Sequence, residues 1–480
     1  MQQRSHHHST RAFSLMASLI AMLALSLVSP LASAQETGGS SAGSGAYIRI
    51  TDANFKKSLM ALPPFQFQGV AAQSPQHLNI GKTLFDVFRN DMEVSGYFEF
   101  IRPAAYLEDT SKVGLRPAGQ EANGFKFESW KQIGTDFLVR AGYRVTGTEV
   151  SFDTYVYFVA QNKLVLGKTY KGRTNDVRTI AHTFANDVIK ELTGRQGMFL
   201  SKIVASRSTR GTQKEIFIMD WDGANSRQIS SHKSIAVSPS WSYNGKMLAY
   251  SAFTMHAQTK RRNLDLYTYD TSTGRRFLVS YRQGINSGAT FFPNNRHLLL
   301  TISQRGNPDL YKMSIDGKTL EPLTKGPSGA LNVEPSVSPD GSRIAFSSDR
   351  GGRPHIFVMN ADGSGVRRIT IAGDYNSAPR WSPDGQRLVF AGNDKGHFDI
   401  FTVKADGSDM VRLTSAKKPN GRWADNEDPS YSPDGRHVLF VSNRTGANQL
   451  YIVTADGDTE KRITFDGNQY FKPHWSPTFD

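Results

Sequence analysis

Three near-copies of one segment dominate the C-terminal half of this 480-residue chain. They begin at Pro335, Pro379 and Pro429, and each places Ser-Pro-Asp-Gly before a run of β-branched and aromatic residues. Proline presets φ, aspartate bonds its own backbone and glycine accepts positive φ, so this tetrapeptide predicts a hairpin turn. Copies spaced roughly 40–50 residues apart are typical of repeat architectures, and this spacing constrains the fold more than any other feature.

Each copy continues through two more apolar segments that a second tight turn separates, so one unit holds four short strands. The second turn is marked in six units by Asp222-Gly223, Thr273-Gly274, Asp316-Gly317, Asp362-Gly363, Asp406-Gly407 and Asp456-Gly457. Degenerate segments, Trp241–Gly245 and Phe291–Asn295, replace Ser-Pro-Asp-Gly in two units before the clear copies. Six units of four strands predict a six-bladed β-propeller over 196–480.

The two ends of the expected propeller complement each other. The first unit begins near Phe199 and lacks the strand that leads into the first turn, whereas the chain ends on such a strand at Pro473–Pro477. Blades bury their apolar faces only against neighbouring blades, so the ring must close. We therefore expect the C-terminus to supply the innermost strand of the first blade.

The first 34 residues have the pattern of a signal peptide. Arg4 and Arg11 precede an apolar run at Leu15–Val28, and Ala32–Ala34 is an Ala-x-Ala-like cleavage site. The run is shorter than the roughly 20 apolar residues that a spanning helix needs. We expect removal of 1–34 and export to the periplasm, with an uncleaved anchor as the alternative.

Residues 35–46 are rich in Gly and Ser, which predicts a flexible segment. Gly39–Gly43 matches the G-x-S-x-G pattern of a nucleophile elbow. That motif requires a strand before it and a helix after it, and neither is expected here.

Composition narrows the class of function further. The chain has no Cys, which excludes thiol nucleophiles and thiolate metal sites. Its net charge is +14. The basic residues are dispersed, however, and the densest clusters are only Lys260–Arg262 and Arg275-Arg276. Such dispersed charge favours a solvated surface over a nucleic-acid site. An acidic protein partner or an anionic cell wall would be attracted to a surface of this kind.

A small α/β domain is expected over 47–195. Helical spacing of apolar residues predicts helices over Asn79–Ser95 and Val177–Leu192. Alternation predicts strands at Tyr47–Ile50, Leu59–Leu62, Tyr97–Ile101, Phe137–Val145, Val150–Val159 and Leu164–Tyr170. His182 and Asp187 lie on the second helix, where no catalytic or metal-ligand partner stands at useful spacing, so structural roles are expected.

Four parts of the chain carry a resemblance to a known family. They are Ile48–Ile50 with Met60–Gly69, Gly134–Val139, Ala181–Gly194 with Gly197–Phe199, and Phe471–Pro477. Together they resemble the TolB family, the periplasmic propeller proteins of the Tol-Pal system in Gram-negative bacteria. The helix segment and the closing strand are more specific than the repeats, which many propellers share.

This resemblance implies a protein-binding scaffold. TolB-like proteins bind the peptidoglycan-associated lipoprotein Pal over one propeller mouth, and their mature N-terminal strand binds TolA or docks back on the protein. The matching strand residues here are Tyr47, Ile48, Arg49 and Ile50. These contacts support outer-membrane integrity and constriction at division. The extra residues 35–46 depart from the family and leave the TolA contact open.

The implied protein is a periplasmic monomer without nucleic-acid binding or direct membrane insertion. Pal and TolA are the expected partners, and other Tol and outer-membrane proteins are further candidates. No cofactor, catalytic residue or metal ligand is expected. A structural Ca²⁺ ion in the channel is an alternative that no EF-hand-type spacing supports.

The loops that enter the innermost strands share one face of a propeller and form the candidate binding surface. Four units carry an Asn three residues before the first Pro of the repeat, or before the equivalent position. Two explanations are open: the asparagines form a polar ring around the mouth, or each one simply caps a turn. The candidate residues here are Asn286, Gly288, Asn332, Val333, Glu334, Asn376, Asn426, Glu427 and Asp428.

Two rival functions stay open. An exported propeller enzyme, a glycan or lactone hydrolase, would need converging carboxylates such as Asp265, Asp309 and Asp399. Their positions near the start of one strand in three units fit repeat architecture better. The second rival is a receptor that takes a small ligand at the channel mouth.

Overall fold

The computed structural model describes residue 48 and residues 56–69, 73–255, 260, 262–304, 306–324, 327 and 329–479. They belong to one compact unit, Ala46–Asp480. The expected signal peptide (1–34), the Gly/Ser-rich segment (35–46) and three candidate strand residues (Tyr47, Arg49 and Ile50) lie outside the described residues. No helix among the described residues is both long enough and apolar enough to cross a membrane.

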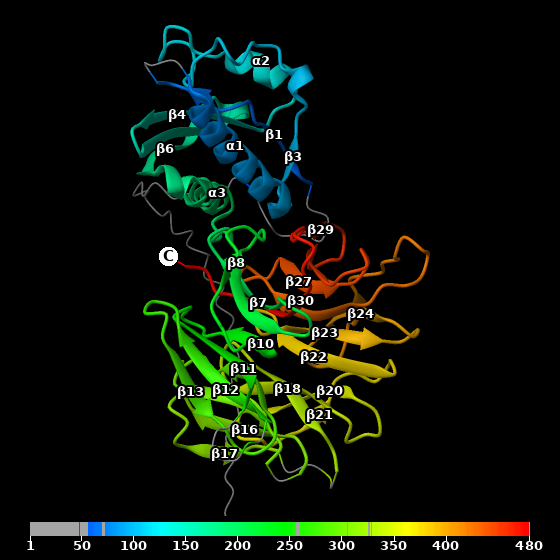
Figure 1. The fold of residues 1–480 in the computed structure, drawn as a ribbon. Coiled ribbons are helices and arrows are strands. Elements are labelled where there is room, and N and C mark those ends of the chain that lie inside the picture. Colours follow the sequence, from blue (N-terminus) through cyan, green and yellow to red (C-terminus); the bar gives the residue numbers. More distant parts are fainter. Residues whose placement is uncertain are drawn as a thin grey trace, which may run out of the picture. The chain divides into compact units, whose positions relative to one another are not determined.

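An α/β region with one six-stranded sheet precedes the propeller (Figure 1). The strand order is β3-β1-β4-β5-β6, and β2 also pairs with β4. Strand β1 runs parallel to β3 and β4, whereas β4, β5 and β6 are antiparallel. The strands are β1 (Ser58–Ala61), β2 (Gln66–Phe67), β3 (Phe98–Phe100), β4 (Phe137–Thr146), β5 (Glu149–Phe158) and β6 (Lys163–Arg173). Three-residue 3₁₀ turns lie at Pro103–Ala105, Val159–Gln161 and Thr174–Asp176.

The two predicted helices are present as α1 (Pro75–Ser95) and α3 (Val177–Thr193). Helix α1 begins earlier than predicted because Ser74 caps it, accepting a hydrogen bond from the amide of His77, and Pro75 suits the first turn. Both helices end at a glycine with positive φ, Gly96 at 72° and Gly194 at 71°. This conformation is the one that favours glycine after a helix.

The sheet buries both of its faces. Alternate residues of β4, including Phe137 and Val139, join the core that α1 and α3 cover. The intervening Leu138 points to the other face, where it packs with Phe125 and Trp130. Trp130 belongs to α2 (Phe127–Gln132), a short helix that the sequence analysis missed along with β2. Elements of six and two residues are too short to show a period.

The predicted six-bladed propeller is confirmed by six four-stranded antiparallel sheets (Figure 1). The innermost strands, from blade 1 to blade 6, are β30 (Tyr470–Trp475), β10 (Ala236–Trp241), β14 (Asn286–Phe291), β18 (Asn332–Val337), β22 (Tyr375–Trp381) and β26 (Asn426–Tyr431). The second strands are β7 (Lys202–Ser208), β11 (Met247–Met255), β15 (His297–Ile302), β19 (Arg343–Ser348), β23 (Arg387–Asn393) and β27 (His437–Ser442).

The outer half of each blade completes the repeat. The third strands are β8 (Lys214–Asp220), β12 (Arg262–Asp270), β16 (Asp309–Ser314), β20 (His355–Asn360), β24 (Phe398–Lys404) and β28 (Gln449–Thr454). The outermost strands are β9 (Arg227–Gln228), β13 (Arg276–Ser280), β17 (Leu320–Pro322), β21 (Arg367–Arg368), β25 (Val411–Arg412) and β29 (Glu460–Arg462).

The C-terminal strand closes the ring as the sequence predicts. Strand β30 pairs with β7, with Tyr470 opposite Arg207 and Trp475 opposite Ile203. In Figure 1 the red end of the chain runs beside green β7. The Ser-Pro-Asp-Gly turns also form as expected: in blade 5, Gly385 has φ of 68° and its amide donates to the carbonyl of Ser382.

Candidate functional site

Each innermost strand carries a bulge near its start, at the third residue in five blades and at the fourth residue in blade 5, so six related residues surround the start of the channel. The pairing register shifts there in all six blades. The bulge residue has positive φ each time: Ser238 (52°), Gly288 (64°), Glu334 (53°), Ala378 (52°), Asp428 (56°) and Lys472 (47°). Only one of the six is glycine, and left-handed backbone costs other residues roughly 1–2 kcal/mol. Bulges often re-aim side chains at functional sites.

Three of these six residues form an ion-pair network in the channel. Lys472 Nζ lies 2.8 Å from Glu334 Oε1 and 2.7 Å from Asp428 Oδ1. The other carboxylate oxygens accept backbone hydrogen bonds, Glu334 from Ala378 and Asp428 from Lys472. Blade 1 and blade 4 are opposite in the ring, so the ammonium group spans the channel. It occupies the place between the two carboxylates where a bound cation would otherwise fit.

The same network decides the protonation of Glu334. Burial opposes ionisation of this carboxyl group, but the charge and hydrogen bond of Lys472 keep the pKa of Glu334 below its ordinary value. The pKa of Lys472 is raised, because the two carboxylates outweigh its burial. No pattern in the sequence points to Lys472, because a lone lysine in the closing strand belongs to no motif.

The four candidate asparagines do not form an exposed polar ring. Asn286, Asn332 and Asn426 are completely buried and Asn376 is 3% exposed. Each one stands two residues before the bulge residue of its strand, and each bonds to the preceding blade. A buried amide must satisfy its donors and acceptor within the protein, so these side chains cannot reach a partner.

Two of these contacts join an asparagine to a carboxylate of the neighbouring blade. Asn332 Nδ2 donates to Asp309 Oδ1 at 2.8 Å, and Asn426 Nδ2 donates to Asp399 Oδ1 at 2.8 Å. Asp399 also accepts from Thr414 and pairs with Arg412. These aspartates therefore act as blade-to-blade links.

The other blades use different groups for the same link. Asn376 bonds to His355 Nδ1 at 2.9 Å, and Asn286 donates to the carbonyl of Leu264 at 3.0 Å. Asp265, the third acid of the enzyme alternative, is buried and accepts from Asn263. The three aspartates are thus engaged by neighbouring side chains, as repeat architecture predicts.

Glu427 differs from its neighbours at this mouth, because no hydrogen bond or ion pair of its carboxylate is found among the described residues. It is half-buried. Burial and the adjacent Asp428 carboxylate raise the pKa of Glu427 to about 7. Val333 lies at the matching position of blade 4 and is also half-buried, and Gly288 lies one position on in blade 3.

Apolar side chains frame the same mouth. Ile285 and Leu331 lie just before the innermost strands of blades 3 and 4, and Tyr375 is the first residue of the innermost strand of blade 5. Their surfaces are 38%, 41% and 44% exposed, respectively. Trp423, on the loop that leads into blade 6, is 44% exposed and stacks on His397 at 4.7 Å between ring centroids. Exposed aromatic and aliphatic groups beside polar ones are typical of protein-binding surfaces.

Of the N-terminal candidates, only Ile48 is described. Its side chain is 3% exposed and belongs to the core that α1 and α3 cover, and its amide donates to the carbonyl of Leu192 at 2.9 Å. Ile48 is therefore packed on the protein itself.

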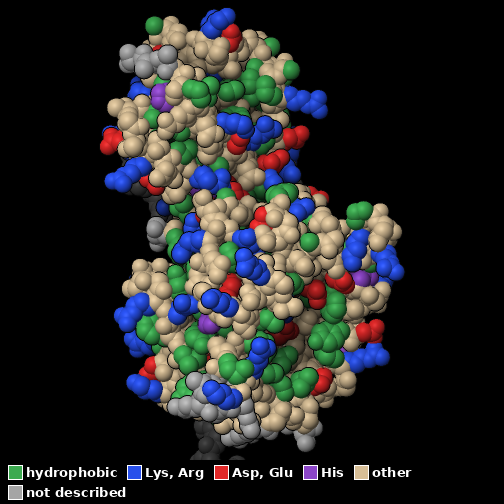
Figure 2. Space-filling model, viewed as in Figure 1, with side chains coloured by type: hydrophobic (Ala, Val, Ile, Leu, Met, Phe, Trp, Pro, Cys, Tyr) green, Lys and Arg blue, Asp and Glu red, His purple; other side chains and the backbone are tan. Residues whose placement is uncertain are grey.

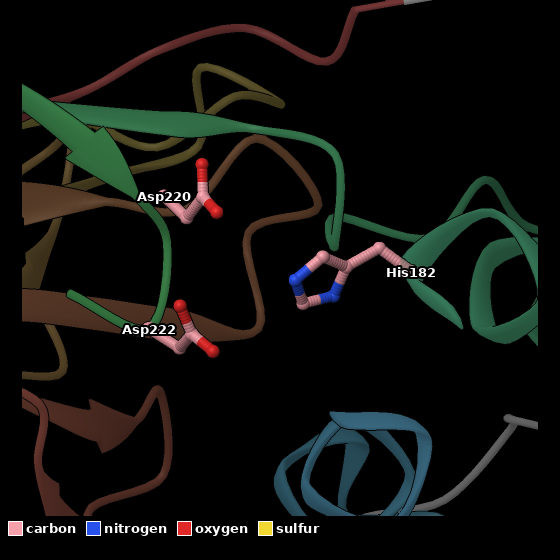
Figure 3. Close-up of side chains that lie close together, drawn as sticks. All are labelled: His182, Asp220 and Asp222. Atoms are coloured by element: carbon pink, nitrogen blue, oxygen red, sulfur yellow. The ribbon is translucent and has the colours of Figure 1, made fainter. Parts of the chain in front are cut away.

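His182 has partners that the sequence analysis did not foresee. It lies on α3 and faces Asp220, the last residue of β8 in blade 1, and Asp222 in the turn after it (Figure 3). The potential ligand atoms of the three residues lie within 4.8 Å of one another. These partners come from residues distant in the chain, so spacing along the sequence did not reveal them.

The cluster is already neutralised by protein cations. Arg178 pairs with Asp222 and approaches Asp220 to 3.7 Å, and Lys202 Nζ lies 2.6 Å from Asp220. His182 Nδ1 bonds to the buried Asp91 at 2.7 Å. A metal ion would have to displace Arg178, so this cluster fits a structural role that ties α1 and α3 to blade 1.

Surface charge does not gather into a stripe on the visible face. Figure 2 shows Lys and Arg side chains scattered among acidic and apolar ones. Of the basic pair Arg275-Arg276, Arg275 lies in the β12–β13 turn and Arg276 begins β13.

Comparison with known families agrees with this architecture. The family model described as the TolB amino-terminal domain matches residues 46–165, and the one described as the TolB beta propeller domain matches residues 189–419 and 374–480. The crystal structure of TolB from Acinetobacter baumannii superposes with a TM-score of 0.71, at 22% identity, covering 88% of this chain and 97% of that one. At this identity the likeness speaks for the fold alone.

Curated relatives carry the same name. The Tol-Pal system protein TolB of Desulfosudis oleivorans is 31% identical over 279 residues, which are 58% of this chain and 60% of that protein. The TolB homolog of Chlorobium chlorochromatii is 32% identical over 304 residues, 63% of this chain and 64% of that protein. The aligned regions thus span less than two thirds of these relatives. Because the propeller family model alone covers more than half of the chain, the chain belongs to the TolB family, whose members are periplasmic components of the Tol-Pal system.

Proposed function

We propose that this chain is a non-enzymatic scaffold of the Tol-Pal system that binds Pal over the acidic mouth of its propeller. Family membership supports the class of function. The location of the site is supported by two features that lie together at this mouth. Glu427 has no ion-pair partner among the described residues, and the side chains of Leu331 and Tyr375 are exposed beside it. Exposed aromatic anchors beside polar groups are the usual centre of a protein interface.

The choice of variant follows from the ion-pair network. Reversal of charge at Glu334 or Asp428 would also break the contacts of Lys472, so a loss of binding could reflect a distorted channel. Glu427→Lys changes the charge of the mouth without removing such a pair. We expect it to weaken the affinity for purified Pal by about tenfold or more in calorimetry, which corresponds to about 1.4 kcal/mol.

A matched control separates this effect from general electrostatics. Glu321→Lys makes the same charge change at an exposed position of β17, the outermost strand of blade 3, and should leave the affinity within about twofold of the parent value. Tyr375→Ala should weaken binding without any change of charge. Parental affinity in both Glu427→Lys and Tyr375→Ala would rule out this mouth as the Pal site.

We also propose that TolA binds the N-terminal region that contains Tyr47, Ile48, Arg49 and Ile50. The docked position of Ile48 supports a segment that either packs on the protein or is captured by a partner. Deletion of 35–50 should abolish TolA capture in a pull-down, whereas deletion of 35–46 should retain it. Loss of capture in both deletions would assign the contact to the Gly/Ser-rich segment instead.

Export through cleavage after Ala34 belongs to the same proposal. Mass determination of the protein purified from a periplasmic extract should give a chain that begins at Gln35. A mass that includes residues 1–34 would favour the uncleaved anchor.

A further inference from the structure

A cavity of about 270 Å³ lies on the channel axis at the end where the innermost strands finish. All six blades contribute to its wall. The blades supply aromatic groups, such as Trp241, Trp381 and Trp475, and prolines from the Ser-Pro turns. The volume lies just below the range of roughly 300–1,000 Å³ for ligand sites, so only a small ligand would fit, and aromatic walls with a few polar groups are typical of such sites. Glu427 and the acidic mouth belong to the opposite end of the strands.

Arg380 supplies a positive charge to this cavity. Its guanidinium group donates one hydrogen bond, from Nη1 to the carbonyl of Pro379 at 2.9 Å. Among the described residues no carboxylate forms an ion pair with it, and none of the residues that line the cavity is acidic. Arginine remains charged in proteins. Burial lowers the pKa of Arg380, and the Glu334 and Asp428 carboxylates, which pair with Lys472, partly oppose this shift. Apart from the bond to Pro379, no hydrogen bond of the guanidinium group to another described residue is found, so an incoming carboxylate would accept from its remaining donors.

His474 adds a second hydrogen-bond donor beside Arg380. Its Nδ1 accepts a hydrogen bond from the backbone amide of Trp241 at 3.3 Å, so the ring hydrogen of the neutral imidazole lies on Nε2. Burial, assisted by the charge of Arg380, lowers the pKa of His474 to about 3. The imidazole is therefore neutral at ordinary pH and acts as an N–H donor.

Tyr243 lies at the solvent edge of the cavity. It is 38% exposed, and its hydroxyl group donates to the carbonyl of Val337, two blades away, at 3.1 Å. The tyrosine thus crosses part of the opening. A ligand that enters must be small and must pass this ring.

We propose that this cavity binds a small organic carboxylate with an aromatic or apolar body. The guanidinium group of Arg380 would hold the carboxylate through charge-assisted hydrogen bonds. The indole rings of Trp381 and Trp475 would contact the body. The proposal concerns the end of the channel away from the proposed Pal site and does not depend on it.

The wild-type protein tests the chemical class directly. Phenylacetate and its neutral isostere phenylacetamide are titrated into the protein, with calorimetry and tryptophan fluorescence as readouts, because three of the wall residues are tryptophans. We expect phenylacetate to bind at least about tenfold more tightly than phenylacetamide. Equal affinities, or no heat and no fluorescence change with phenylacetate at millimolar concentration, would overturn the proposal. So would inorganic phosphate binding as tightly as phenylacetate, because the body would then contribute nothing.

Variants locate the site. Arg380→Gln should remove the preference for phenylacetate over phenylacetamide, whereas Arg296→Gln, an exposed arginine at the β14–β15 turn, should keep it. If Arg380→Gln does not fold, Tyr243→Ala provides the second test, because it opens the cavity edge and should change the association rate of phenylacetate. An unchanged preference in folded Arg380→Gln, or an unchanged rate in Tyr243→Ala, would place binding elsewhere and contradict the proposal.

Discussion

Lys472 and Asp428 meet inside the channel, with Nζ and Oδ1 2.7 Å apart. The same ammonium group lies 2.8 Å from Glu334 on the opposite blade. The strand that closes the ring thus also supplies the cation that pairs with two acids of other blades. Closure and channel chemistry are therefore coupled.

Lys472→Met should destabilise the protein, because it leaves Glu334 and Asp428 without a cation. Removing one partner of a buried pair costs roughly 3–5 kcal/mol, but the lysine side chain is 36% exposed, so we expect about 2 kcal/mol. Thermal unfolding measures this. Lys318→Met is the control, since its pair with Asp316 is exposed, and an equal effect of both variants would contradict a special role of Lys472.

Deletion of Phe471–Asp480 should remove the innermost strand of blade 1 and abolish the cooperative unfolding transition of the propeller. The exposed strand edge and apolar faces would leave the ring open. Calorimetric melting of the truncated and full chains tests this. A truncated chain that melts like the full chain would show that β30 does not hold the ring.

Two tryptophans provide a finer test of the same closure. Trp475 is 3% exposed and its Nε1 donates to Ser201 at 2.7 Å, so Trp475→Ala should cost about 3–5 kcal/mol. Trp423→Ala, at a 44% exposed position, should cost well under half of that. Chemical denaturation compares the two, and a similar loss in both would contradict the assigned packing of β30.

Asp91 should make stability depend on pH in an unusual direction. Burial raises the pKa of Asp91 from 3.8 to about 6, against the opposing effects of His182 and Arg178, with Asp222 raising it further. Because the folded value lies above the unfolded one, the native state binds the extra proton between these values. The contribution of Asp91 to the free energy of unfolding is complete below about pH 4 and is lost as pH rises through about 6. This contribution is at most about 3 kcal/mol.

The difference in melting temperature between the parent and Asp91→Asn isolates this effect from other carboxyl groups. The melting temperature of the parent should fall relative to that of Asp91→Asn as pH rises from 4 to about 6.5. Asp86→Asn, which changes an exposed carboxylate of the same helix, is the control and should track the parent. A difference that stays constant over this range would refute the assignment.

Binding of Pal should depend on pH through Glu427. Its pKa of about 7 means that the carboxyl group is mostly neutral at pH 6 and mostly ionised at pH 8. If the negative mouth attracts the partner, affinity should rise between these values. Glu427→Gln should bind with the weaker affinity throughout and lose most of the pH dependence. An equally steep profile in that variant would assign the dependence to another group.

The repeats show how far local sequence reaches. The Ser-Pro-Asp-Gly turns, the two helices with their glycine ends, the six blades and the closing strand at Pro473–Pro477 were all predictable. Each depends on residues close together in the chain or on the requirement that a ring close. The missed elements, α2 and β2, are too short for periodicity.

The candidate site was predicted less well. The repeated asparagines were visible, but their burial and their bonds to Asp309 and Asp399 were not. Lys472, Arg380 and the partners of His182 carried no local signal, because their importance lies in what faces them across the fold.

The sequence by itself determined the number of blades, the turns and the family, because these follow from local propensity and from a repeated pattern. Only the tertiary structure decided which polar residues are buried links and which remain at the two ends of the channel. Hydrogen bonds and ion pairs form between atoms a few ångströms apart, and residues as distant in the chain as Glu334 and Lys472 meet only once the ring has closed.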